Sequence, residues 1–138
     1  MTLEQMDIFR MEVARQAFDS YNFSHPNVIY NEKVMETWEK KGNTYSITLP
    51  LNEQTKNGNI EEDNVILYVD FKDNDFRLDN EEGGIHAYSE KKGNRIGKIS
   101  NDFYENIEAF YNKLDAQYLE EVAKEVVVEP KERFNIKF

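Results

Sequence analysis

The chain contains no cysteine. Without a thiol it has no thiolate nucleophile, no zinc–thiolate site and no redox-active disulfide. The absence of cysteine also fits a reducing compartment. Histidine is almost as scarce, since His25 and His86 are the only two, and this leaves few side chains that titrate near neutral pH. Composition alone therefore narrows the catalytic chemistry open to the protein.

Long hydrophobic runs are also missing, and none approaches the roughly 18 residues that a membrane-spanning helix needs. The first ten residues carry Glu4 and Asp7, where a secretion signal has Lys or Arg followed by an apolar run. A length of 138 residues is that of one ordinary domain. We therefore predict a soluble, cytoplasmic protein in which residues 1–138 form a single α+β domain, with no membrane partner.

Basic residues are few, because 27 acids stand against 17 bases and the net charge is −10. A surface of this sign repels phosphate backbones and anionic lipids, so direct binding to nucleic acid or membrane is disfavoured. The same field attracts a basic protein and speeds its capture. A plainer interpretation is that the acidity only keeps the protein soluble.

Motifs for catalysis and metal binding are incomplete. The stretch "EEGGIH" (81–86) has two glycines but lacks the lysine and the spacing of a phosphate-binding loop. The stretch "DNDFRLDNEE" (73–82) places Arg77 and Leu78 where an EF-hand needs an oxygen ligand and a glycine. We therefore predict no enzyme, no cofactor and no metal. The carboxylates that leave a looser divalent site open are those of Asp73, Asp75 and Asp79.

Periodicity predicts an amphipathic helix at the start of the chain. Thr2 and Gln5 fit a capping box, and apolar residues recur at helical spacing to about Tyr21. Pro26 then ends the helix, because the residue before a proline is pushed out of helical geometry.

The pentapeptide "EKKGN" occurs at 39–43 and again at 90–94. Short alternating segments surround both copies, so we predict two hairpins, each with a four-residue type I turn and glycine in the left-handed conformation. For the first copy a short helix over 31–42, which Asn31 would cap and Gly42 would end, stays an alternative. We prefer the strand.

The middle and end of the chain complete an α+β fold. The segment 65–71, "VILYVDF", is the most apolar strand, and it belongs to an antiparallel meander of five or six short strands. From Ser100 to about Glu125 the period becomes helical, "VVVEP" ends that helix, and 134–138 alternates like an edge strand. We predict an N-terminal helix, the meander, a long C-terminal helix packed on the sheet, and a short C-terminal edge strand.

Carboxylates gather in two stretches. Residues 61–82 hold nine acids against Lys72 and Arg77, and residues 102–125 hold seven against Lys113 and Lys124. Rows of carboxylates can imitate the phosphates of a duplex, although a solvated face is the simpler interpretation. Three tyrosines spaced by seven residues lie along the second stretch, and tyrosine is enriched at binding surfaces as well as at the margins of cores.

These patterns favour a non-enzymatic acidic protein-binding module. Such a module would act as an inhibitor or immunity-type factor that occludes a basic, nucleic-acid-handling protein by nucleic-acid mimicry. Two alternatives stay open: a cystatin-like pocket that binds a small ligand or uses His86 for weak catalysis, and a secretion-chaperone-like or assembly homodimer. The predicted partner-binding residues are Asp70, Asp73, Asp75, Asp79, Glu81, Glu82, Tyr104, Glu105, Glu108, Tyr111, Asp115 and Tyr118.

Overall fold

The computed structural model describes residues 1–23, 28, 37–54 and 56–137, with side chains for all of these except 53, 54, 82 and 125–137. The chain divides into two compact units, Met1–Phe103 and Tyr104–Phe138. The α+β class is confirmed, while a single domain over 1–138 stays a prediction.

The first unit opens with helix α1 (Leu3–Asp19), capped as the sequence predicts. The Gln5 N–H donates to Thr2 Oγ1 at 3.1 Å, and the Thr2 N–H donates to Gln5 Oε1 at 2.9 Å. The helix ends at Asp19, slightly before the predicted Tyr21, because Tyr21 begins strand β1. Its buried face includes Val13, Ala14, Ala17 and Phe18.

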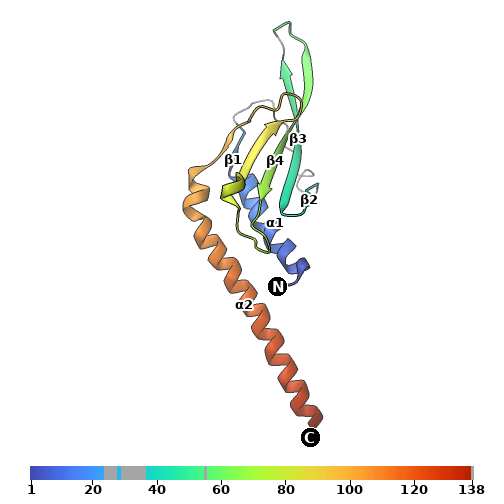
Figure 1. Ribbon diagram of the computed structural model, residues 1–138, viewed down its shortest axis with the longest axis vertical. Coiled ribbons are helices and arrows are strands. Elements are labelled where there is room, and N and C mark those ends of the chain that lie inside the picture. Colours follow the sequence, from blue (N-terminus) through green and yellow to red (C-terminus); the bar gives the residue numbers. More distant parts are fainter. Residues whose placement is uncertain (24–27, 29–36, 55, 138) are drawn as a thin grey trace. The chain divides into compact units, whose positions relative to one another are not determined.

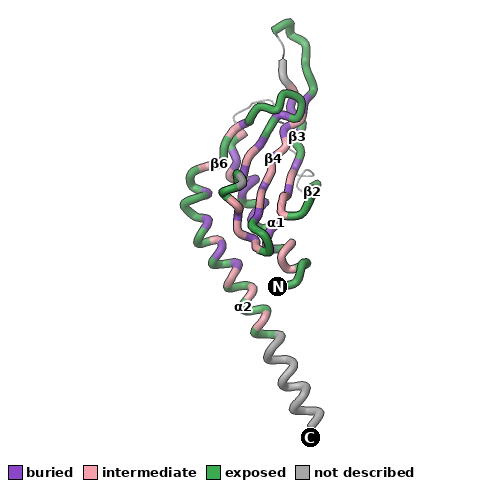
Figure 2. Tube along the Cα trace, in the orientation of Figure 1, coloured by how far each residue is buried: buried purple, intermediate pink, exposed green. Residues whose placement is uncertain are grey.

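The main sheet is antiparallel and its strands follow one another in chain order. It consists of β2 (Glu39–Lys41), β3 (Thr44–Gln54), β4 (Ile60–Asp70) and β5 (Ile85–Ser89). Helix α1 lies on one face of this sheet (Figure 1). Positions along β4 alternate between buried and half-exposed from Asp63 onward, and Figure 2 shows the same alternation in the neighbouring strands. The predicted meander is therefore confirmed.

A second, two-stranded sheet pairs β1 (Tyr21–Asn22) with β6 (Lys98–Ile99), which brings the described strands to six. Gly97 permits this pairing, since a Cβ atom there would lie 2.1 Å from the carbonyl oxygen of Asn22. Its φ of +66° is also one that side chains with a Cβ seldom adopt. A single 3₁₀ turn, η2 (Asn80–Glu82), precedes β5.

The two "EKKGN" copies form different turns. In the first copy Lys41 pairs with Thr44, so only Gly42 and Asn43 connect β2 to β3. A four-residue turn is therefore the wrong prediction here, because the first three residues of the pentapeptide belong to the strand. Gly42 nevertheless has the predicted left-handed conformation, with φ +57°. The part of the alternative helix over 31–36 lies outside the described residues.

The second copy has the predicted four-residue connection. The Ser89 N–H donates to the carbonyl of Asn94 at 2.9 Å, and the Gly93 N–H donates to that of Ser89 at 2.8 Å. Gly93 has φ +71°. One pentapeptide thus adopts two conformations, and the residues that contact it decide which.

The second unit consists of helical chain, since helix α2 runs over Asn101–Lys137. The predicted end near Glu125 and the predicted edge strand over 134–138 are wrong, because helical backbone continues past Pro130 to Lys137. A helix already formed gains one hydrogen bond with each added residue, so it can extend through a position where one bond is lost. Ile107, Tyr111 and Leu114 are buried along this helix, and Phe110 is half-buried. Packing of this helix on the sheet stays a prediction.

Within the described residues, neither helix includes a stretch both long and apolar enough to cross a membrane.

Candidate functional site

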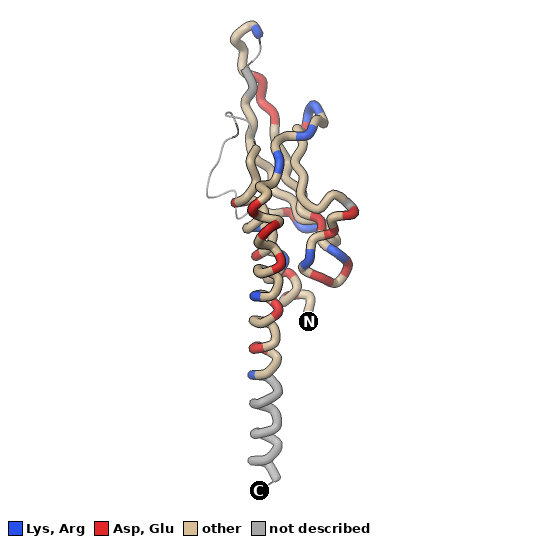
Figure 3. Tube along the Cα trace, turned by 90° about the vertical axis from the view of Figure 1, so that its left-hand side faces the viewer, with Lys and Arg blue, Asp and Glu red and all other residues tan. Residues whose placement is uncertain are grey.

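The predicted partner-binding residues fall into two groups, one in each unit. Residues 70–82 belong to the first unit and residues 104–118 to the second. Figure 3 shows acidic and basic positions close together in the loop between β4 and β5, and mainly acidic positions along the described part of α2.

In the first group, Asp70 and Asp75 stabilise the protein's own fold. The Asp70 carboxylate accepts a hydrogen bond from Thr44 Oγ1 at 2.8 Å and lies 3.7 Å from His86 Nδ1. The Asp75 carboxylate accepts from the backbone N–H groups of Phe76 and Arg77 at 2.7 and 3.2 Å. Both carboxylates therefore already accept hydrogen bonds from within the protein.

Arg10 of α1 fixes the loop that carries these acids. Its side chain is buried and donates to the carbonyls of Asp75 and Lys72 at 2.7 and 2.9 Å, and to Asn43 Oδ1 at 3.1 Å. The guanidinium also lies 5.2 Å from the centre of the Phe71 ring. Arg10 shares the apolar face of α1, and an arginine in such a position is the signal that sequence reasoning passed over.

Fewer carboxylates of this group are therefore open to a partner than the sequence suggests. Asp79 is half-exposed and has contacts of its own, and the side chain of Glu82 lies outside the described residues. The acids of this group that the structure shows exposed are Asp73 and Glu81.

In the second group the three tyrosines differ in exposure. Tyr104 is 42 % exposed, Tyr118 is half-buried, and Tyr111 is only 4 % exposed. The three tyrosines therefore do not share one exposed surface, since Tyr111 is buried, and whether Tyr104 and Tyr118 bind a partner stays a prediction. Asp115 is half-buried and has contacts of its own.

Four carboxylates on α2 are different, because nothing in the described chain binds them. Glu105 and Glu108, both predicted, are exposed, as are Glu120 and Glu121. No hydrogen bond or ion pair within the described residues involves these four carboxylates, which we call the α2 carboxylates.

One buried carboxylate with several hydrogen-bond donors, Asp63, was not predicted as a functional residue. It is buried and accepts hydrogen bonds from Ser89 Oγ, from the Lys91 N–H at 3.0 Å and from the Asn64 N–H at 2.7 Å. Burial alone would raise the pKa of Asp63, but these hydrogen bonds outweigh it and lower the pKa. Since strand residues alternate, Asp63 shares the inward face with Val65, and this is the signal that could have identified it.

Lys91 also protects the edge of β4. Its Nζ donates to the carbonyl of Glu62, next to the point where the pairing of β5 with β4 ends at Ser89 and Val65. A lysine placed over unpaired backbone hinders the addition of a foreign strand. The second "EKKGN" copy thus contacts the edge of β4 through Lys91 and has a structural role there.

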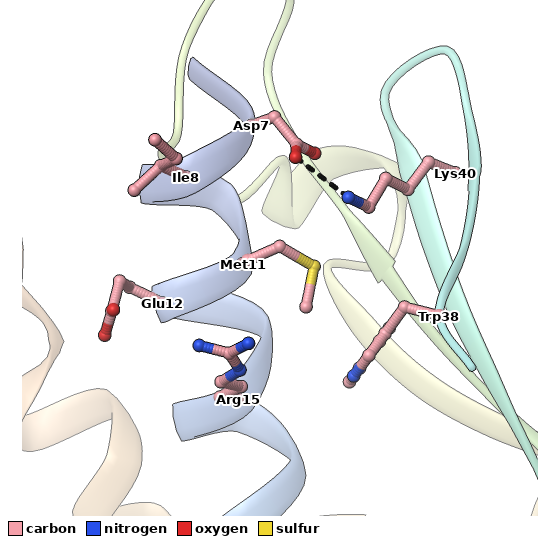
Figure 4. Close-up of a pocket in the computed structure, with 7 residues that line it drawn as sticks. All are labelled: Asp7, Ile8, Met11, Glu12, Arg15, Trp38 and Lys40. Atoms are coloured by element: carbon pink, nitrogen blue, oxygen red, sulfur yellow. Dashed lines mark hydrogen bonds and ion pairs between the residues drawn. The ribbon is translucent and has the colours of Figure 1, made fainter. Parts of the chain in front are cut away.

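A groove lies between α1 and β2. It is open to solvent and has a volume of about 390 Å³. The residues that line it are Asp7, Ile8, Met11, Glu12, Arg15, Trp38 and Lys40 (Figure 4). Lys40 Nζ lies 2.8 Å from the Asp7 carboxylate, which also accepts a hydrogen bond from the hydroxyl of Tyr45. Sequence reasoning missed this groove because it depends on how α1 and Trp38 are placed in space.

Asp7 and the Tyr45 hydroxyl influence each other's pKa through their hydrogen bond. Burial would raise the pKa of Asp7, but the hydrogen bonds from Lys40 and Tyr45 lower it overall. Burial and the hydrogen bond to Asp7 both raise the pKa of Tyr45, so its hydroxyl keeps its proton.

His86, the residue of the alternative catalytic interpretation, lies on β5 among aromatic rings. Its ring stacks on Tyr68 with centroids 5.4 Å apart and meets Tyr88 edge-on at 5.3 Å. His25 lies outside the described residues. Among the side chains that the structure describes, no three or more His, Asp or Glu residues are arranged to hold a metal ion, and this applies to Asp73, Asp75 and Asp79 as well.

Comparisons of this chain with protein-family models, with curated proteins and with solved structures find no match.

Proposed function

We propose that the protein is a non-enzymatic binding module that docks a basic protein through the α2 carboxylates. The observation that carries this proposal is the contrast between two kinds of acid. Asp63, Asp70 and Asp75 already accept hydrogen bonds from the protein itself. The α2 carboxylates are exposed and have no such partner in the described chain, so lysines and arginines of another protein can approach them.

A nucleic-acid-handling protein is the class of partner that this arrangement suits. Glu105 and Glu108 are three residues apart on a helix, which corresponds to about 4.5 Å along its axis. Successive phosphates of one DNA strand rise by about 3.4 Å along the axis of the duplex. A helix that presents this pair, and Glu120 and Glu121 about three turns further on, would compete for the cationic groove of that partner, as an inhibitor or immunity-type factor does.

The test begins with affinity capture from a cell extract at low and high salt, followed by titration of the purified partner. Binding should weaken steeply with salt, and duplex DNA should compete. The decisive variant replaces the α2 carboxylates by amides: Glu105→Gln, Glu108→Gln, Glu120→Gln and Glu121→Gln. It should reduce the affinity at least tenfold.

The matched control removes the same charge from exposed acids of the first unit, through Glu61→Gln, Glu62→Gln, Asp73→Asn and Glu81→Gln. It should leave most of the affinity intact. Equal loss in the two variants would mean that only the net charge matters, and salt-insensitive binding would refute the proposal. The cytoplasmic location, the homodimer and the ligand-pocket alternatives stay predictions.

A further inference from the structure

The groove between α1 and β2 combines apolar side chains with the cations Arg15 and Lys40, and the proposed docking through α2 does not use it. We propose that it binds a small amphipathic anion, that is, a molecule with an apolar body and a carboxylate or sulfonate head. Its volume of about 390 Å³ lies within the range of roughly 300–1,000 Å³ that is usual for small-ligand pockets. Separate residues of the groove match the body and the head of such a molecule.

The apolar body would contact Met11, Trp38 and Ile8. Figure 4 shows the Met11 side chain directed from α1 toward Trp38 across the groove. The indole ring of Trp38 is held in place by Phe18, which it meets edge-on with centroids 6.3 Å apart. Ile8 is 55 % exposed at the rim. A ligand that covers these side chains removes apolar surface from water.

Two cations flank this apolar part. Arg15 is exposed and has no hydrogen bond or ion pair within the described residues, so its planar guanidinium is available to an anion. Lys40 uses one of its three donors on Asp7, at 2.8 Å. Arg15 therefore offers donors to the head group of the ligand, while Lys40 lies at the opposite end of the groove, beside Asp7 (Figure 4).

The carboxylates of the groove do not cancel this preference. Asp7 already accepts from Lys40 and from the Tyr45 hydroxyl. Figure 4 shows Glu12 pointing away from β2, on the other side of the helix. The indole Nε1–H of Trp38 is buried and has no acceptor among the described residues.

Trp38 is the only tryptophan of the chain, so its fluorescence reports on this groove alone. The probe is 8-anilinonaphthalene-1-sulfonate, which combines an aromatic body with an anionic head and accepts excitation energy from tryptophan. We expect saturable, one-to-one quenching of Trp38 emission with transfer to the probe. Arg15→Gln should weaken binding about five- to tenfold, because it removes a charge-assisted contact.

Further experiments distinguish binding in this groove from binding that depends only on positive charge or on apolar surface elsewhere on the protein. Lys98→Gln removes one positive charge from an exposed position on β6 and should leave the affinity unchanged. Met11→Glu places a carboxylate between the apolar residues and should weaken binding more than tenfold. Decanoate should displace the probe, whereas decanol, which has the same chain without the charge, should not.

The proposal fails if probe fluorescence rises without quenching of Trp38, since the probe then binds elsewhere. It fails equally if Arg15→Gln and Lys98→Gln bind alike, or if decanol competes as well as decanoate. Thermal unfolding followed by circular dichroism shows whether each variant is folded. If the Met11→Glu variant does not fold, the comparison of Arg15→Gln with Lys98→Gln decides whether the proposal holds, because Arg15 is exposed.

Discussion

Asp63 offers the sharpest test of how this fold uses its acids. Its carboxylate accepts three hydrogen bonds, and two of the donors, Ser89 and Lys91, belong to β5 and the turn that follows it. In Asp63→Asn the amide oxygen can keep both backbone N–H groups, but the charge is lost. A hydrogen bond to a charged group contributes about 1.5–3 kcal/mol and a neutral one about 0.5–1.5 kcal/mol. Water can reach the turn, so we expect a loss of about 1–2 kcal/mol at pH 7.

The effect should depend on pH with a definite sign. The folded protein lowers the pKa of Asp63, so the unfolded chain takes up the proton first as the pH falls. The stabilisation is therefore complete above the unfolded pKa of about 3.9 and is lost as the pH falls through the lower, folded value. Wild type and Asp63→Asn should converge in stability in that acidic range.

Urea unfolding of both proteins between pH 7 and pH 2.5 measures this difference. Asp73→Asn is the control, because it removes the same charge from an exposed carboxylate and should change the free energy of unfolding by less than about 0.5 kcal/mol. Two results would refute the reasoning. One is an Asp63→Asn protein as stable as wild type at pH 7, and the other is a difference that persists unchanged at pH 2.5.

Substitutions at Arg10, Gly97 and Tyr45 test other parts of the first unit by urea unfolding. Arg10→Met should destabilise by about 3 kcal/mol, because three acceptors lose their donor, and an equal loss in Arg10→Lys would show that charge alone does not suffice. Gly97→Ala should destabilise more than Gly42→Ala, since both glycines have positive φ but only the first has backbone within 3 Å of an added Cβ; equal effects would contradict this. Tyr45→Phe should cost about 1 kcal/mol and move the pKa of Asp7, followed by carboxyl NMR, back toward its ordinary value. An unchanged Asp7 titration would mean that the tyrosine hydroxyl does not contribute.

Periodicity was sufficient to predict the main elements of the fold. The capping box of Thr2 and Gln5 predicts where α1 begins. Alternation in 44–51 and the apolar run 65–71 predict strands that pair as β3 and β4. These signals are local, and each is repeated over several residues. The errors lie where one residue or one short segment had to decide, as at Pro130 and in the first "EKKGN" copy.

The interactions that join distant segments could not be predicted from sequence spacing. Arg10 donates to carbonyl groups that are more than sixty residues away in the sequence. Asp63 on β4 accepts a hydrogen bond from Ser89 on the neighbouring strand β5. The groove beside Trp38 likewise needs α1 and β2 to lie next to each other. A periodic pattern identifies the face on which a residue lies, but it does not identify the residue that faces it.

The net charge of −10 is therefore a poor guide to where a partner would bind. A carboxylate that is partly buried and already accepts hydrogen bonds offers a foreign lysine fewer free lone pairs and less exposed surface. Asp63, Asp70 and Asp75 are in this position, although they belong to the more acidic stretch of the sequence. The α2 carboxylates lose only water when a cation approaches. For this reason the less acidic stretch is the better candidate for docking, and neutralising equal numbers of acids in the two stretches should separate charge from position.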